Sequence, residues 1–309
     1  TATRNTIVGY TAADALTTGD QNTVMGYDAL GAGIASYYNT AFGTGALRAD
    51  TTGRNSVAVG ISALYSQNTT GSADMFNTAV GSGSGFNVTT GFKSTYIGGN
   101  AGYFATTADT TTFVGFKAGQ GIDGAKLTGN HNVAVGANAG LLLQGAAAEN
   151  TVVGTDSGDA ITTGTRTVAV GYNAGGGITT GDSNVAIGWQ ALLTEDAHSN
   201  NVAVGASALQ TQNAGAHAYN VAVGFEAGKI ITDGANNTFV GGLAGDGTDD
   251  GAKNVAVGTS SLSANCGDKN TAVGYAAGFA TTGADNTVVG HEAGKGLLGG
   301  KGNTLIGSS

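Results

Sequence analysis

The side chains best suited to chemistry in this chain are few and widely spaced. The segment 246–250 reads Asp-Gly-Thr-Asp-Asp and brings Asp246, Asp249 and Asp250 close together in the sequence. Carboxylate oxygens are the ligands that Ca²⁺ prefers. The segment lacks the repeated Gly-Gly-x-Gly-x-Asp pattern of calcium-binding β-rolls, so it is only a weak calcium candidate. We predict no other metal site and no cofactor.

Histidine, glycine and acidic residues give no stronger site. His198 and His217 occupy the same point of two successive repeats, where exposed turn histidines are a commoner arrangement than a metal pair. The Gly81–Gly85 string is similar to a phosphate-binding loop, but no helical pattern follows it. Asp and Glu are scattered over turns, whereas polysaccharide-cleaving sites need clustered carboxylates or bases. We therefore expect the protein not to be an enzyme.

The best candidates for contact with a partner are aromatic. They share one position, directly after a recurring glycine, and are Tyr10, Tyr27, Phe116, Tyr172, Trp189, Phe225 and Tyr275. Aromatic side chains on the flank of a rod suit contacts with sugars or proteins. Packing at a subunit interface explains them equally well.

The recurring glycine closes a five-residue motif such as Asn201–Gly205, and eighteen copies of this motif position all the residues above. The glycine, called the anchor here, is Gly9, Gly26, Gly43, Gly60, Gly81, Gly98, Gly115, Gly136, Gly154, Gly171, Gly188, Gly205, Gly224, Gly241, Gly258, Gly274, Gly290 and Gly307. Of the seventeen intervals between successive anchors, eleven have the same length as the interval from Gly188 to Gly205. Such a period, roughly 17 residues, predicts an all-β, parallel β-solenoid of about 18 coils.

The motif itself predicts a strand. The residue before the anchor is apolar in all eighteen copies, and the residue three before it is Thr or Val. Because strand side chains alternate, these two positions share a face, which we expect to form the coil interior. The residue between them is Ala in ten copies. We expect this Ala face to be covered by another chain.

Two further columns complete the predicted coil. The fourth residue before the anchor is Asn in fourteen copies, which predicts a ladder of stacked amides. The small residue three positions after the anchor and the Gly or Leu that usually follows it predict a second short strand. Glycine recurs seven positions before the anchor, where we expect a turn with positive φ. Extra residues in the two longest repeats should loop out around Ser66–Phe76 and Ile122–Asn130.

Composition restricts the function classes. The chain has 56 Gly, no Pro, one Cys and a net charge of −9, and no basic patch is visible, so nucleic acid is an unlikely partner. No apolar run approaches the roughly 18 residues that a membrane-spanning helix needs, so we predict no membrane insertion. One cysteine excludes an intrachain disulfide. We predict one uninterrupted solenoid domain over residues 1–309.

The repeated Asn-Ser/Thr-x-Ala-Val/Ile-Gly motif, followed by x-x-Ala, resembles the head repeats of trimeric autotransporter adhesins, the YadA-like family. Similar arrays occur in phage tail fibres. This resemblance implies a left-handed β-roll, a homotrimer, and an adhesive role at an extracellular, cell-surface or virion-surface location, with a glycan or protein as receptor.

Two other readings remain open. The first is a self-assembling extracellular filament, stacked end to end, because the first and last coils are predicted to expose strand edges that need a cover. The second is an ice-binding solenoid. It is less favoured, because we expect the threonines to lie in Thr-Thr turns instead of a regular Thr-x-Thr array.

Overall fold

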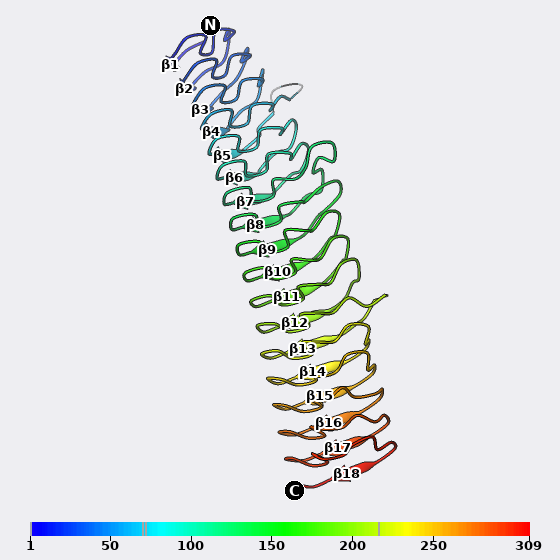
Figure 1. The fold of residues 1–309 in the computed structure, drawn as a ribbon. Helices are drawn as coiled ribbons and strands as arrows, with labels where there is room; N and C mark the ends of the chain where they lie inside the picture. Colours follow the sequence, from blue (N-terminus) through cyan, green and yellow to red (C-terminus); the bar gives the residue numbers. More distant parts are fainter. Residues whose placement is uncertain (1, 70, 72, 216) are drawn as a thin grey trace. The chain divides into compact units, whose positions relative to one another are not determined.

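A computed structural model describes residues 2–69, 71, 73–215 and 217–309, so two positions of the loop predicted around Ser66–Phe76 lie outside the described residues. The chain forms two compact units, Thr1–Thr163 and Gly164–Ser309, which are described one at a time. In both, each coil contributes one three-residue strand, and no helix is present among the described residues. Figure 1 shows the strands following one another along each unit. That the whole chain is a single domain stays a prediction.

The first unit contains nine strands within its described residues. They are β1 (Thr6–Val8), β2 (Thr23–Met25), β3 (Thr40–Phe42), β4 (Val57–Val59), β5 (Thr78–Val80), β6 (Thr95–Ile97), β7 (Thr112–Val114), β8 (Val133–Val135) and β9 (Thr151–Val153). Each strand pairs in parallel with the next, in a register that aligns equivalent residues, as Ala41 aligns with Ala58.

The second unit repeats this arrangement, again with nine strands in its described part. They are β10 (Val168–Val170), β11 (Val185–Ile187), β12 (Val202–Val204), β13 (Val221–Val223), β14 (Thr238–Val240), β15 (Val255–Val257), β16 (Thr271–Val273), β17 (Thr287–Val289) and β18 (Thr304–Ile306). Pairing is parallel here too, for example Ala203 with Ala222. The predicted parallel β-solenoid with a 17-residue period is therefore confirmed.

The predicted orientation of the strands is wrong. In β12 the middle residue, Ala203, is fully buried, while Val202 and Val204 are only half-buried. The same pattern holds from β2 to β17, so the Ala face lines the interior and the Thr/Val and Val/Ile columns face outward. Alternation alone does not say which face is inside. The coil is so narrow that its interior accepts alanine and turns the β-branched side chains out.

Interior volume is shared between the strand and the segment after it. Where the middle strand residue is large, as in Phe239, glycines approach its ring: a Cβ on Gly228 would lie 2.8 Å from Phe239. Where the middle residue is Ala203, the fourth residue after the anchor is Leu209, which is also fully buried. In other coils with a middle Ala, such as that of Ala169, this position is Gly175 and the fully buried Ile178 fills the core instead.

The segment after the anchor is a series of tight turns; the predicted second strand is not formed there. The second and fourth residues after the anchor have positive φ in coil after coil, for example Ser207 (φ 55°) and Leu209 (φ 48°). Backbone that alternates into the left-handed region cannot pair as an extended strand. The frequent glycine at the fourth position fits this conformation.

The asparagine ladder is confirmed, and its bonds go mainly to the backbone. Asn237 Oδ1 accepts the backbone N–H of Asn254 over 2.8 Å, and Asn237 Nδ2 donates to the Gly251 carbonyl over 2.9 Å. Gly251 stands seven residues before its anchor and has no positive φ, contrary to prediction. Glycine fits there because a Cβ would clash with the backbone of the next coil at Cys266.

Candidate functional site: an exposed outer face on each unit

Each unit presents an outer face made by the first and third residues of its strands. None of these side chains is fully buried within the described chain. Ile187 of β11 is 37% exposed and Phe42 of β3 is 50% exposed. Every first residue is Thr or Val and every third residue is apolar. The outer face is thus a regular, uncharged array of branched side chains, with one row per coil.

The aromatic contact residues predicted from the sequence border this outer face. All seven are exposed, with Tyr10 at 78% and Tyr172, the least exposed, at 49%. Tyr10 and Tyr27, in neighbouring coils, stack with ring centroids 6.0 Å apart. Tyr275 stacks in the same way on His291, at 5.2 Å. Each unit therefore exposes an aromatic column beside its branched array.

A second aromatic stack lies in the turns of the first unit. The rings of Tyr65, Phe86 and Tyr103 are parallel within 6° and lie 4.8–4.9 Å apart. Arg48 extends this column, with its guanidinium 5.4 Å from the Tyr65 ring centre, and forms an ion pair with Asp28. A shallow depression of about 390 Å³ lies beside Arg48 and Asp28. Its opposite charges neutralise each other, so it has no single-sign character that would select a charged ligand.

Two of the acidic residues that we expected to be scattered over turns are fully buried. Asp50 accepts hydrogen bonds from Gln67 Nε2 (2.9 Å) and the Gly53 N–H (2.8 Å), and burial raises the pKa of its carboxyl group. Glu195 accepts from Gln212 Nε2 over 2.9 Å. Their position seven residues after the anchor, otherwise often apolar, is the signal that could have identified them.

The predicted calcium segment does not assemble a metal site. Asp249 Oδ1 accepts a hydrogen bond from Thr232 Oγ1 over 2.6 Å, and Asp246 is partly buried, with the pKa of its carboxyl group raised by that burial. In the described parts of the chain no three His, Cys, Asp or Glu side chains form a possible metal-binding group. Asp246, Asp249 and Asp250 are therefore not brought together as ligands.

The two aligned histidines have separate protein partners. His198 Nδ1 lies 2.9 Å from Glu195 Oε1, and its side chain is 20% exposed. His217 is exposed, and its Nδ1 accepts the Ser199 backbone N–H over 3.3 Å. The His198 ring therefore bonds within its own turn, whereas the His217 ring bonds to the turn of the preceding coil.

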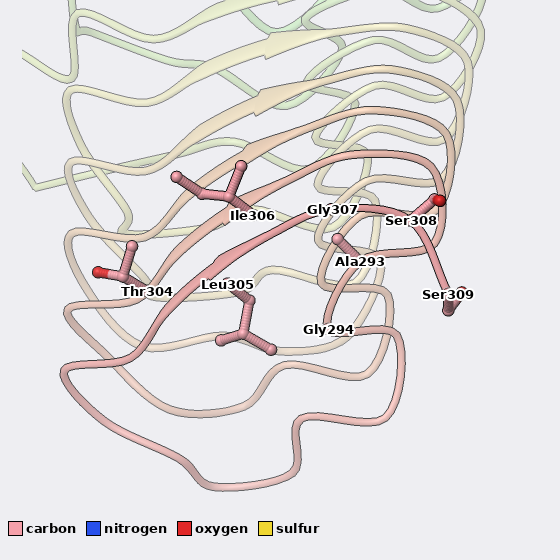
Figure 2. Close-up of a pocket in the computed structure, with 8 residues that line it drawn as sticks. All are labelled: Ala293, Gly294, Thr304, Leu305, Ile306, Gly307, Ser308 and Ser309. Carbon is pink, nitrogen blue, oxygen red and sulfur yellow. The ribbon is translucent and has the colours of Figure 1, made fainter.

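An open hollow of about 420 Å³ lies against the free edge of β18. Figure 2 shows Leu305 pointing into the coil interior, while Thr304 and Ile306 point to the opposite side of the strand. The hollow has the apolar floor of a coil interior, with Ala293 and Gly294 in its lining. Its walls carry no acid, base or metal ligand that could do chemistry.

No protein-family model matches this sequence, and no curated protein matches it either. Among the described residues, no helix is long and apolar enough to cross a membrane.

Proposed function

We propose that the protein is a non-enzymatic structural and adhesive fibre module whose outer face is covered by other copies of the same chain. The observation that carries this proposal is the restricted composition of the outer face. Its two positions admit only Thr or Val and only apolar residues, respectively, although both remain accessible in the single chain. Exposed strand positions that had to satisfy only solvent would accept charged and polar residues freely.

The hydrophobic effect favours covering such a face. Val, Ile, Met or Phe occupies the third position of every strand, and exposed apolar patches on soluble proteins commonly mark interaction sites. Charged residues make up only 11% of the chain and are absent from the two strand columns, so no charge would be left unpaired when the face is buried. A second solenoid could therefore pack there at low desolvation cost.

A second copy of the chain is the partner with the best geometric match. The outer-face rows repeat once per coil, so a partner needs side chains with the same axial spacing to interdigitate along a whole unit. Another copy of the chain has the same axial spacing because it has the same repeat. The likeness of the motif to YadA-like adhesin heads and to phage fibre repeats favours three copies in parallel, a homotrimer.

The aromatic column gives this assembly a contact surface. Trp189 and Phe225 are 51% and 57% exposed at the border of the outer face, where they can contact either a neighbouring copy or a receptor. Amphipathic aromatic side chains suit both glycan and protein receptors. An adhesive role at an extracellular, cell-surface or virion-surface location follows from this reading.

Mass measurement in solution tests the proposal. Sedimentation equilibrium at micromolar concentration should give an assembly of several 30.0 kDa chains. Replacing the outward Val204 by Asp should release single chains whose circular dichroism is unchanged. A wild-type chain that sediments as a monomer would contradict the proposal.

Ice binding is a second candidate. The objection that the threonines lie in Thr-Thr turns does not apply to the threonines of the strands. Eleven of the first strand residues are Thr, and they face outward in register, for example Thr271 beside Thr287. A regular array of hydroxyl and methyl groups is what such a surface requires. Bulky aromatics such as Tyr275 (52% exposed) border the array and weigh against close contact with a flat crystal face. Thermal hysteresis of the freezing point would distinguish this function from assembly.

A further inference from the structure

Two buried pairs of carboxylate and amide recur, one in each unit. In the first unit Gln67 Nε2 donates to Asp50 Oδ2 over 2.9 Å, and in the second Gln212 Nε2 donates to Glu195 Oε2 over 2.9 Å. All four side chains are fully buried. The partners in each pair are 17 residues apart, so they stand at equivalent points of successive coils.

Each glutamine also makes a bond on its other side. Gln67 Oε1 accepts from Asn77 Nδ2 over 3.0 Å, and Gln212 Oε1 accepts from Asn220 Nδ2 over 3.1 Å. Asn77 and Asn220 belong to the asparagine ladder of the following coil. Each glutamine therefore links an acid in the coil before it to a ladder asparagine in the coil after it.

Both glutamines lie in coils that carry extra residues. The interval from Gly60 to Gly81 and that from Gly205 to Gly224 are both longer than the usual interval between anchors. Gln67 and Gln212 stand seven positions after the anchor, just before the extended turns at Asn68 and Asn213. The chain returns from each extension to the ladder asparagine that the glutamine holds.

The extension changes the normal ladder bond. In ordinary coils the ladder asparagine donates to the carbonyl seven positions before the next anchor, as Asn39 does to Gly53 over 2.8 Å. In the extended coils the ladder residue before the extension contacts the buried pair, whereas Asn77 and Asn220 after it keep the ordinary bond, to the carbonyls of Gly91 and Gly234 over 2.7 Å. Gln67 Nε2 donates to Ser56 Oγ over 3.1 Å, and Asn201 Nδ2 donates to Glu195 Oε2 over 3.4 Å.

We infer that these two bridges, Asp50–Gln67–Asn77 and Glu195–Gln212–Asn220, hold the base of an extended turn to the solenoid. Each bridge supplies hydrogen-bond partners to the buried ladder residues on both sides of the extension, Ser56 and Asn77 in the first unit and Asn201 and Asn220 in the second. It also joins the two ends of the extension through a single side chain. In the sequence, a buried acid that is followed one coil later by a glutamine therefore indicates an extended turn held in this way.

The third long coil buries an apolar residue after its extension. The interval from Gly115 to Gly136 is as long as that from Gly60 to Gly81, but here the extra residues precede the fully buried Leu127. Leu127 forms parallel bridges to Ala105 and Gly145 in the adjacent coils. Backbone bridges therefore follow this extension, as they do between Arg54 and Asp74 in the first bridged coil, and here the apolar Leu127 is buried in the interior.

Hydrogen exchange in a variant without the first bridge tests the inference. Asp50→Asn combined with Gln67→Met removes the bridge at nearly constant volume, without leaving an unpaired buried charge. In the intact chain the Asn68 N–H donates to Thr89 and the Met75 N–H donates to Arg54, each over 3.0 Å. We expect exchange at these two amides to accelerate by at least about tenfold, with the amides of β2 and β9 unchanged.

Two further variants make the outcome decisive. Gln144→Met, in a coil of the same unit without a bridge, should leave exchange at Asn68 and Met75 unchanged. Shortening the 60–81 coil to the usual repeat length in the double-variant background should restore a protected, folded unit, even if the double variant itself unfolds. Unchanged exchange in the double variant, or a shortened variant that remains unfolded, would overturn the inference.

Discussion

Gln212 donates a hydrogen bond to Glu195 from the next coil, over 2.9 Å, at a point where both side chains are inaccessible to solvent. A buried carboxylate is stable only when donors surround it, and here Gln212, Asn201 and His198 supply them. The interior of this solenoid is therefore not uniformly apolar. It contains specific polar contacts that distinguish individual coils from their neighbours.

Removing the glutamine alone should be costly. Gln212→Met keeps the length of the side chain but removes the shorter of the two bonds to Glu195 Oε2 and one of the two acceptors of Asn220 Nδ2. We expect the free energy of unfolding to fall by about 1–3 kcal/mol, the usual cost of removing a hydrogen-bond partner from a buried polar group. Urea denaturation measures it, and Gln210→Met, at a half-buried position in the same coil, is the control. Equal stability of the two variants would contradict this account of the pair.

The buried Asp50 predicts a pH dependence. Burial raises the pKa of Asp50 above its ordinary 3.8, and hydrogen bonds from Gln67 and Gly53 oppose that rise. A raised folded-state pKa contributes stability that is complete below the ordinary pKa and is lost as the pH rises through the folded value. Asp50→Asn does not titrate, so its stability relative to the wild type should increase as the pH is raised through this range. Urea midpoints measured for both proteins at several pH values check this, and a constant or decreasing difference would contradict it.

The anchor glycines should tolerate no side chain. Gly205 has φ 138°, and a Cβ there would lie 2.6 Å from the backbone carbon of Gly224 in the next coil. We expect Gly205→Ala to lower the free energy of unfolding by more than about 2 kcal/mol. Gly296, which has open space around its Cβ position, is the control: Gly296→Ala should change stability by less than about 0.5 kcal/mol. Similar melting temperatures for the two variants would show that the close contact between the anchor glycines of successive coils does not limit stability.

Orientation of the strand predicts opposite effects at adjacent residues. Ala203→Leu overfills the interior beside Leu209 and should cost about 1–3 kcal/mol. Val204→Ala, on the outer face, should cost a single chain less than about 1 kcal/mol. Thermal unfolding under dissociating dilution measures both, and a larger loss at Val204 would restore the orientation first expected from the sequence.

The repeat predicts much of the fold, and the features that it does not predict have physical causes. The period and the Asn201–Gly205 motif predict the strands, their parallel stacking and the asparagine ladder. Alternation cannot say whether Ala203 or Val204 is inside, because both are apolar. Composition also cannot reveal that Ser207 and Leu209 adopt positive φ, since neither residue is typical of that conformation.

The candidate site was predictable in part. The position after the anchor varies freely, which correctly indicates exposure for residues such as Tyr10 and Trp189. The array of Thr, Val and Ile beside it was missed, because invariant apolar positions usually indicate a core. Asp50 and Glu195 were missed because burial of an acid depends on partners one coil away, which composition does not disclose.

The mass of the protein in solution tests the central proposal most directly. Sedimentation equilibrium of the wild-type chain at micromolar concentration should give about three times the 30.0 kDa of one chain, and Val204→Asp, which places charge on the outer face, should give a folded single chain. Large heterogeneous polymers would favour end-to-end filaments instead of trimers. A wild-type protein that keeps the mass of a single chain, with its outer face in water, would contradict the assignment of that face to assembly.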